Sequence, residues 1–143
     1  MTETASFLLV TAGGRLVGLP VESLVAVADF PPPHRVPSSE PALRGVATVR
    51  GELMPVVHLG AFLDGGTCPP SVGDAGVVIE VNGVRLCLEV DEADVVVRDA
   101  VLPLPPGSAL PWARAVARRS GRLVPLLDLS ALGARLSEAG IDT

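Results

Sequence analysis

The sequence contains no lysine, because all eleven of its basic residues are arginine. Without a lysine ammonium group, the chain can form neither a Schiff base nor the phosphate contact of a P-loop. Aromatic residues make up only 3% of the chain, and the formal net charge is −5. A surface that binds a nucleic-acid backbone needs an excess of cations and rings for base stacking. We therefore expect no nucleic-acid partner.

Cysteines and long apolar runs are also scarce. Cys68 and Cys87 are the only cysteines, and their spacing fits no CxxC pair, so no disulfide framework is expected. No apolar run reaches the roughly 18 residues of a membrane-spanning helix. The first residues carry no basic segment ahead of an apolar stretch, as a signal peptide would. These features predict a cytoplasmic protein.

The residues that are abundant indicate a small β protein. Hydrophobic residues make up 48% of the 143 positions, and with so few aromatics the core must be aliphatic. The chain has 15 glycines and 14 prolines, which interrupt long helices and favour short strands joined by turns. The length suits a single domain.

The most informative feature is an internal repeat. Residues 51–62 align with residues 121–132 at a constant offset of 70, and residues 19–21 align with residues 88–90 at an offset of 69. A hairpin signal precedes each of the latter two segments, Gly13-Gly14 in one copy and Asn82-Gly83 in the other. The chain is therefore predicted to contain two copies of one unit of about 70 residues.

Each copy is predicted to form about five short strands, which is the strand count of a small closed barrel. In the first copy the expected strands are residues 7–12, 15–19, 24–30, 45–49 and 53–59. In the second copy they are residues 76–81, 84–90, 95–98, 113–118 and 123–127. Residues 31–41 and 103–111 are expected to be proline-rich loops, and residues 64–75 a linker. One helix is expected at the end, capped by Asp128 or Ser130, with Leu129, Leu132 and Leu136 on one face.

Catalytic and metal-binding patterns are missing from the sequence. It has no G-x-S-x-G segment, and no pair among His34, His58, Cys68 and Cys87 has the spacing of zinc ligands. A lone histidine in a loop or at a strand end is most often a surface residue or one that is already hydrogen-bonded. We therefore expect no enzyme, no cofactor and no metal.

An acidic cluster follows the second hairpin. It consists of Glu80, Glu89, Asp91, Glu92 and Asp94. Alternation with the apolar residues Leu86, Leu88 and Val90 is expected to place Glu89 on the outer face of its strand. No D-x-D-x-D-G loop accompanies the cluster, so calcium binding is not expected.

Two features of the first copy admit two interpretations each. Arg50, beside Gly51 in a tight turn, is either a solvated turn residue or an interface anchor that combines a planar donor group with an apolar stem. Residues 24–28 lack polar alternation, so this strand is either buried against the second copy or forms a groove for a partner. Exposed apolar strands without an active site favour a protein that binds other proteins.

These residues carry a resemblance to a known family. Residues 45–59 (GVATVRGELMPVVHL) resemble the G-v-x-n-l-R-G-x-x-x-P-V-x-D-L core of the CheW-like family of chemotaxis coupling proteins. Further matches occur on both sides of this segment, in the same order as in the family, so that the resemblance runs from about residue 6 to residue 136. They are Phe7, the Gly-Leu-Pro-Val segment from Gly18, Val90-Asp91, and the Leu-Leu-Asp-Leu segment ending at Leu129.

The resemblance implies a mostly β fold, with two intertwined five-stranded SH3-like barrels and a short C-terminal helix. Residues 1–143 would be one domain, with one subdomain at about 13–75, a second at about 76–128 with exchanged strands, and the helix at about 129–137.

The resemblance also implies a function. The chain would be a non-catalytic adaptor that joins the regulatory domain of a chemotaxis histidine kinase to the cytoplasmic tip of a chemoreceptor. It would then meet the membrane only indirectly, through receptors. By position, the implied partner contacts are Leu24, Ala26, Val27, Arg44, Gly45, Arg50 and Gly51.

Three positions differ from the family pattern. Family members usually carry an acidic residue where this chain has Ala26, Asp where it has His58, and Asn where it has Thr48. Loss of a carboxylate at position 26 would remove a charged contact from the groove. This difference leaves open a second interpretation, a regulatory module that binds only one of the two partners and tunes or blocks the kinase.

Overall fold

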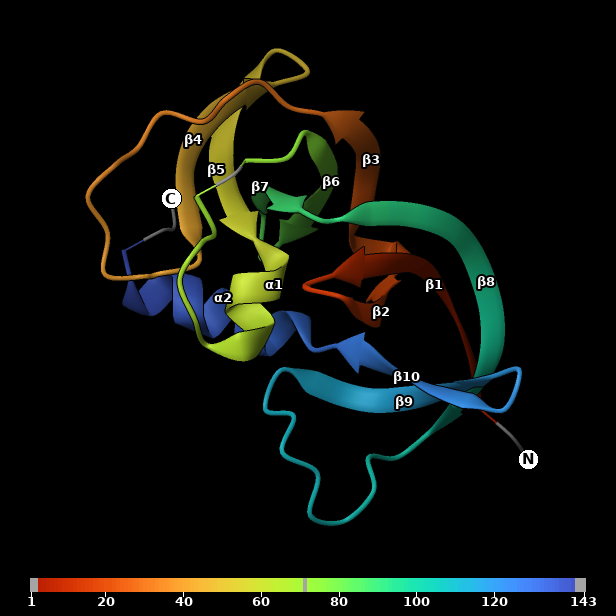
Figure 1. The fold of residues 1–143 in the computed structure, drawn as a ribbon. Helices are drawn as coiled ribbons and strands as arrows, with labels where there is room; N and C mark the ends of the chain where they lie inside the picture. The colour runs from red at the N-terminus through yellow and green to blue at the C-terminus, as the bar shows by residue number, and fades with distance from the viewer. Residues whose placement is uncertain (1–2, 71, 141–143) are drawn as a thin grey trace.

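The structure is a computed structural model that describes residues 3–70 and 72–140, and its strands form two five-stranded sheets (Figure 1). The first sheet closes into a barrel. The order of its strands is β1 (Thr4–Ala12), β2 (Arg15–Pro20), β10 (Arg122–Leu127), β9 (Ala113–Arg119) and β8 (Glu92–Leu102). The order in the second sheet is β3 (Leu24–Asp29), β6 (Ala75–Val81), β7 (Val84–Glu89), β5 (Glu52–His58) and β4 (Leu43–Val49). The predicted mostly β fold is confirmed.

The two copies of the repeat exchange hairpins. The β1–β2 hairpin of the first copy joins β8–β10 of the second, and the β6–β7 hairpin of the second joins β3–β5 of the first. In each sheet, the exchanged hairpin also forms one parallel pair of strands with the other copy. Leu126 of β10 pairs with Gly18 of β2, and Val56 of β5 pairs with Cys87 of β7. These two contacts are related by the offsets of 70 and 69 found in the sequence, so the repeat is a repeat of structure.

A tight two-residue turn connects the two strands of each hairpin, and both residues of each turn have a positive φ. This backbone matches the right-handed twist of the paired strands and favours Gly or Asn. The pairs are Gly13-Gly14 (60° and 76°), Arg50-Gly51 (53° and 83°), Asn82-Gly83 (53° and 80°) and Ser120-Gly121 (49° and 77°). The turn residues predicted from the sequence are confirmed.

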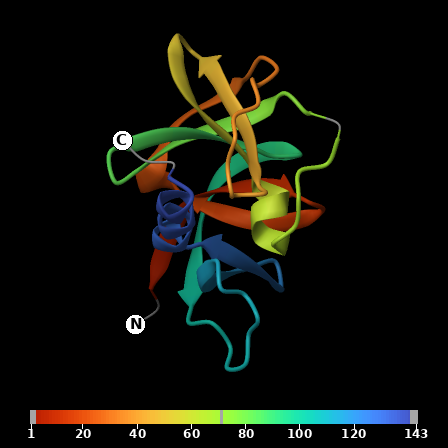
Figure 2. The same cartoon turned by 90° about the vertical axis from the view of Figure 1, so that its left-hand side faces the viewer.

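Besides the 3-10 turn η1 (Val21–Ser23), the described residues contain the helices α1 (Leu59–Asp64) and α2 (Leu129–Glu138). The terminal helix was expected, and Asp128, not Ser130, caps it by accepting hydrogen bonds from Ser130 N and Ala131 N. Helix α1 was not expected: its first residue was assigned to a strand and its last to a linker, and no element was assigned to the residues between them. Figure 2 shows both helices at the level where the two sheets meet. Neither helix of the described chain has the length and apolar character needed to cross a membrane.

The prediction that Glu89 lies on an outer face is wrong. Strand β7 lies between β6 and β5, in the middle of its sheet, and both of its faces are covered. Leu88 is fully buried as expected, but Cys87 is also fully buried, and Glu89 is only 4% exposed. A central strand with two covered faces does not obey polar alternation, so its pattern cannot place a carboxylate in solvent.

Candidate partner-binding surface

Strand β3 forms one edge of the second sheet and exposes two valines. Val25 is 41% exposed and Val27 is 58% exposed, whereas Leu24 and Ala26 are half-buried. Leu24 packs against the main core cluster and Ala26 against the smaller cluster of the second sheet. One face of this strand is therefore buried and the other is open, and a partner groove on the open face stays a prediction. Val27 was among the contacts implied by the sequence, whereas Val25 was not, although the period of two along the strand puts the two valines on one face.

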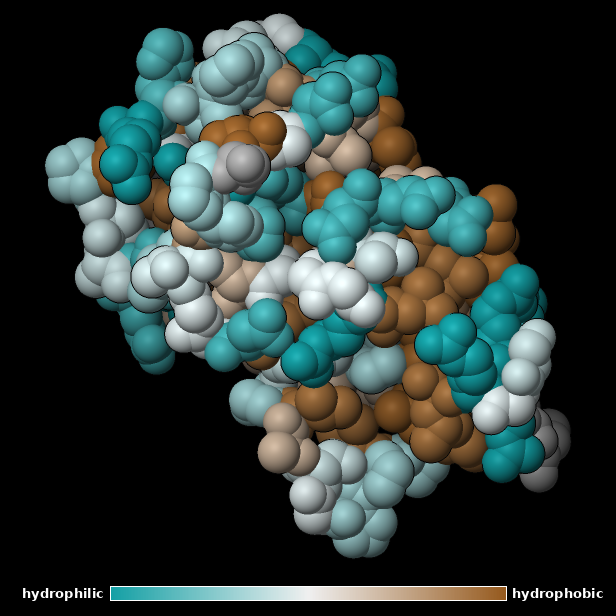
Figure 3. All heavy atoms as spheres, in the orientation of Figure 1, coloured by the Kyte–Doolittle hydropathy of each residue, from teal (hydrophilic) through white to brown (hydrophobic). Residues whose placement is uncertain are grey.

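Strand β8 adds two further exposed valines. Val95 is 53% exposed and Val96 is 58% exposed, although they are consecutive residues and a regular strand would bury one of them. The pairing of β8 with β1 shifts register between Leu8 and Val10, which leaves an additional residue in β8. Such a bulge turns neighbouring side chains away from their regular alternation. Figure 3 shows apolar atoms gathered along β8 and beside it, on the right-hand side of the view.

The β4–β5 hairpin presents Arg50 and Gly51 at its turn. Both residues are exposed, and a Cβ atom built at Gly51 would meet no atom within 4 Å. Leu53, two residues further on, is 67% exposed. The β9–β10 hairpin at the same place in the other copy likewise exposes Leu123, which is 53% exposed. An arginine beside an exposed leucine on a rigid turn has the composition of a protein-binding contact.

The structure places Arg44 inside the molecule. Its side chain is 7% exposed and forms a two-point ion pair with Glu89, with Nε 2.7 Å from Oε1 and the NH2 nitrogen 3.3 Å from Oε2. Its NH1 nitrogen donates to the carbonyl oxygen of Pro69 in the linker. Gly73 N, also in the linker, donates to Glu89 Oε2 at 3.0 Å. This buried pair therefore attaches the linker to the second sheet at Pro69 and Gly73.

Gly45 follows Arg44 and is required by the backbone. Its φ is 147°, and a Cβ atom at this position would lie 2.0 Å from the carbonyl oxygen of His34. His34 and Val46 form an isolated bridge there, with His34 N donating to Val46 O and Val46 N to His34 O. Gly45 thus allows the proline-rich loop to lie against strand β4 at the edge of the sheet.

His58 caps helix α1. Ala61 N donates a hydrogen bond to His58 Nδ1 at 2.9 Å, and His58 Nε2 lies 4.0 Å from Glu89 Oε2. Burial lowers the pKa of His58 below its ordinary value of 6.5, although the nearby Glu89 carboxylate opposes this effect. The position therefore holds a neutral imidazole with a structural role.

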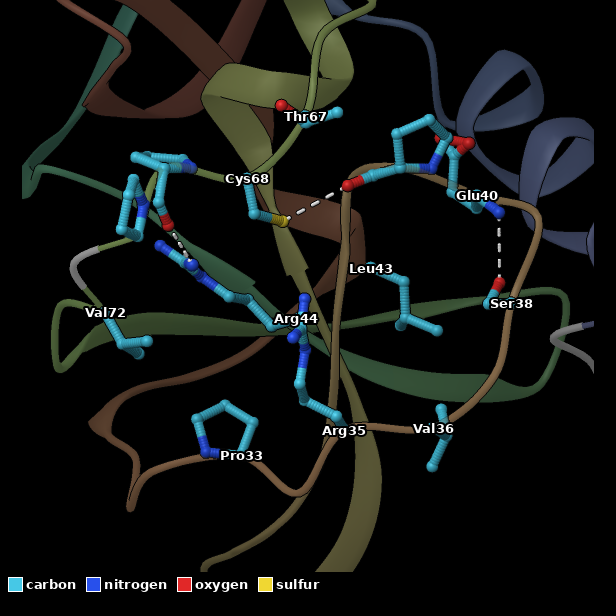
Figure 4. Close-up of a pocket in the computed structure, with 13 residues that line it drawn as sticks. Pro33, Arg35, Val36, Ser38, Glu40, Leu43, Arg44, Thr67, Cys68 and Val72 are labelled. Carbon is cyan, nitrogen blue, oxygen red and sulfur yellow. Dashed lines mark hydrogen bonds between the residues drawn. The ribbon is translucent and has the colours of Figure 1, made fainter.

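A cavity of about 800 Å³ lies between the proline-rich loop and the linker (Figure 4). Arg35, Val36, Leu43, Arg44, Cys68 and Val72 are among the residues that line it. Burial raises the pKa of the Cys68 thiol, whose Sγ donates to Pro41 O at 3.3 Å. Burial also raises the pKa of Cys87 to about 12. Both thiols therefore stay protonated near neutral pH and are poor nucleophiles.

Within residues 3–70 and 72–140, no three His, Cys, Asp or Glu side chains come together as a group able to hold a metal ion. The acidic residues that cluster in the sequence are dispersed in the structure. Glu89 faces the interior, Glu80 pairs with Arg85 on the surface, and Asp91 accepts a hydrogen bond from Gly14 N.

Comparison with protein families gives a match to the CheW-like domain over residues 6–136. The chain belongs to the CheW-like family. Among solved structures, the scaffolding protein TtCheW from Thermoanaerobacter tengcongensis superposes with a TM-score of 0.75 at 16% sequence identity. The match covers 88% of this chain and 90% of that one. No curated protein sequence matches significantly.

Membership in the CheW-like family confirms the resemblance seen in the sequence and the expected fold of two SH3-like barrels. Members of this family are non-catalytic scaffold proteins of chemotaxis signalling, which agrees with the prediction that the chain is not an enzyme. Of the seven residues that the family pattern singles out, Val27, Arg50 and Gly51 are exposed. Leu24 and Ala26 are half-buried, Gly45 is buried, and the Arg44 side chain is only 7% exposed.

Proposed function

We propose that this CheW-like protein joins the regulatory domain of a chemotaxis histidine kinase to the cytoplasmic tip of a chemoreceptor. The family match over residues 6–136 is the observation that carries this proposal. The adaptor acts in the cytoplasm and reaches the membrane only through its receptor partner.

The exposed residues divide into two contact surfaces. The valine surface, formed by Val25 and Val27 of β3 and Val95 and Val96 of β8, offers apolar area to the receptor tip. The arginine turn, Arg50 with Gly51 and the nearby Leu53, offers a directional donor group with an apolar neighbour. Buried apolar area supplies affinity and the guanidinium group supplies specificity.

Ala26 favours a second candidate function. The family usually has a carboxylate at this position, whereas the methyl group of Ala26 packs against the core cluster of the second sheet. Position 26 therefore offers no charged contact, and it lies on the face of β3 opposite to Val25 and Val27. A regulatory module that binds only one of the two partners, and so tunes or blocks the kinase, would fit this loss. Titration with each partner separately distinguishes the two functions, because an adaptor binds both.

Replacing Arg50 by alanine is expected to weaken partner binding by roughly 1–3 kcal/mol, which is about fivefold to more than a hundredfold in Kd. Its guanidinium group contacts a partner and not this chain, so the thermal midpoint should hardly change. Calorimetric titration of the kinase regulatory domain and of a soluble receptor-tip fragment measures the effect. Arg122→Ala, on the exposed β9–β10 hairpin of the other copy, is the matched control. Equal affinities for Arg50→Ala and the unmodified protein with both partners would remove Arg50 from the binding surface.

A further inference from the structure

The junction between β5 and α1 contains a hydrogen bond that only a neutral histidine can make. His58 Nδ1 accepts from Ala61 N at 2.9 Å, and the imidazole is 12% exposed. A protonated imidazole carries a hydrogen on both ring nitrogens and has no acceptor left. Protonation of His58 must therefore break the cap of α1, whatever else it changes.

The charged groups around His58 do not compensate a positive imidazole. Glu89, on β7, is the nearest carboxylate, but Arg44 of β4 and Gly73 of the linker already donate to both of its oxygens. Burial is the largest influence and lowers the pKa of His58, Glu89 raises it, and Arg44 lowers it again. Asp91, after β7, and Asp64, at the end of α1, raise it by smaller amounts.

In the second copy of the repeat, the equivalent helix is capped by a residue other than histidine. Asp128 is the equivalent residue, and its Oδ1 accepts from Ser130 N at 2.9 Å and from Ala131 N at 3.4 Å. The sequence repeat aligns Pro20, at the end of β2, with Glu89, at the end of β7, so no carboxylate at that position faces Asp128 from β2. An aspartate at position 58 would instead lie beside the buried Glu89. Histidine keeps the cap and avoids that repulsion, but it makes the cap titratable.

Helix α1 is also a place where the exchanged parts of the chain meet. Phe62 of α1 accepts a hydrogen bond at its carbonyl oxygen from Arg135 of α2, at 2.8 Å. Gly60 lies against Gly13 of the β1–β2 turn, where added Cβ atoms would approach the facing backbone to 3.3 Å or less. Asp64 forms an ion pair with Arg15 at 3.0 Å. A change in the position of α1 would therefore alter contacts with elements of both sheets.

We propose that His58 is a proton-sensitive cap that holds α1 in place when neutral and releases its first turn when protonated. The device goes beyond the adaptor function and does not depend on it. Because the folded chain disfavours the protonated imidazole, the unfolded chain binds more protons below about pH 6.5. The stability that the neutral cap contributes is thus complete above that pH. It is lost as the pH falls from there to the lower pKa of the folded chain.

The test is an NMR titration of the full chain between about pH 7.5 and 5, in the range where an unperturbed histidine changes charge. Ring nitrogen shifts report the tautomer and midpoint of His58, and a His34→Gln variant assigns its signals. Hydrogen exchange at the Ala61 amide, corrected for its intrinsic pH dependence, reports the cap. We expect a proton on Nε2 at high pH, a midpoint below 6.5, and a roughly fivefold loss of Ala61 protection across that midpoint.

His58→Asn is the matched control, because its side-chain oxygen caps a helix but does not titrate. In this variant Ala61 protection should persist and should not change with pH over the same range. A His58 midpoint at or above 6.5, a proton on Nδ1, or unchanged Ala61 protection across the His58 midpoint would each overturn the proposal. The same loss of protection in His58→Asn would assign it to another group and would also overturn it. The first three results come from the unmodified side chain at position 58, so they do not depend on the folding of a variant.

Discussion

Replacement of Arg44 by alanine is expected to lower the free energy of unfolding by about 3–5 kcal/mol. The side chains of Arg44 and Glu89 are 7% and 5% exposed, so their ion pair is shielded from water. Without the guanidinium group, Glu89 keeps a buried charge with only the Gly73 amide and the neutral His58 nearby. The substitution also removes the hydrogen bond to Pro69 O that holds the linker. Urea unfolding followed by circular dichroism measures the loss.

Arg85→Ala is the control for this prediction. Arg85 pairs with Glu80 at 3.2 Å and Glu52 at 3.4 Å, but its side chain is 44% exposed. Solvent screening limits the effect of such a pair to less than about 1 kcal/mol. Replacing both Arg44 and Glu89 by leucine removes both charges and should recover much of the stability. An Arg44→Ala protein no less stable than Arg85→Ala would show that the buried pair is not formed in solution.

Replacement of Arg135 by alanine is expected to cost about 2–4 kcal/mol. Arg135 bonds the Phe62 carbonyl, lies 4.3 Å from the centre of the Phe62 ring, and pairs with Glu40. The Glu40 side chain is only 7% exposed, so the variant leaves its carboxylate buried without this partner. The contact joins α2, α1 and the proline-rich loop, so its loss should also loosen that loop.

Thermal unfolding and hydrogen exchange of the proline-rich loop measure the effect of the Arg135 substitution. Arg135→Lys is the informative comparison, because it keeps a cation for Glu40 but lacks the planar group that reaches two acceptors. We expect an intermediate stability for it. If Arg135→Ala and Arg135→Lys both unfold at the temperature of the unmodified protein, the contact does not stabilise the fold.

The strands were largely predictable because hydrophobic residues and turn signals alternate clearly along this chain. The pair Asn82-Gly83 predicted the turn of one hairpin, and the repeat predicted the turns of the others by comparison. The exchange of hairpins could not be predicted from the pattern. A strand such as β6 has the same periodicity whether it pairs within its own copy or with β3 of the other copy. The subdomain boundaries at about 13–75 and 76–128 remain a prediction.

Helix α1 was missed although the sequence contained a signal for it. The offset of 70 aligns Leu59-Gly-Ala-Phe62 with Leu129-Ser-Ala-Leu132, which begin the helix that was predicted. Applying the repeat in both directions would have assigned a helix to each. Gly65 is a further signal for this helix, since a glycine with a left-handed backbone commonly ends a helix, and Gly65 ends α1 at φ 70°.

The candidate surface was predicted in part. A tight turn necessarily places Arg50 outside, so its exposure followed from the sequence. The exposure of Val95 and Val96 depends on a bulge in β8, which local patterns do not encode. The buried position of Arg44 depends on Glu89, which lies 45 residues away in sequence and belongs to the other copy of the repeat.

The central claim is that this chain is an adaptor, and calorimetric titration against the regulatory domain of the histidine kinase encoded nearest to it tests that claim most directly. We predict binding with a roughly micromolar or lower Kd, the range of specific interfaces of modest area. We also expect the preformed complex to bind a receptor-tip fragment. Absence of binding to a folded kinase domain, or receptor binding that displaces the kinase, would contradict it.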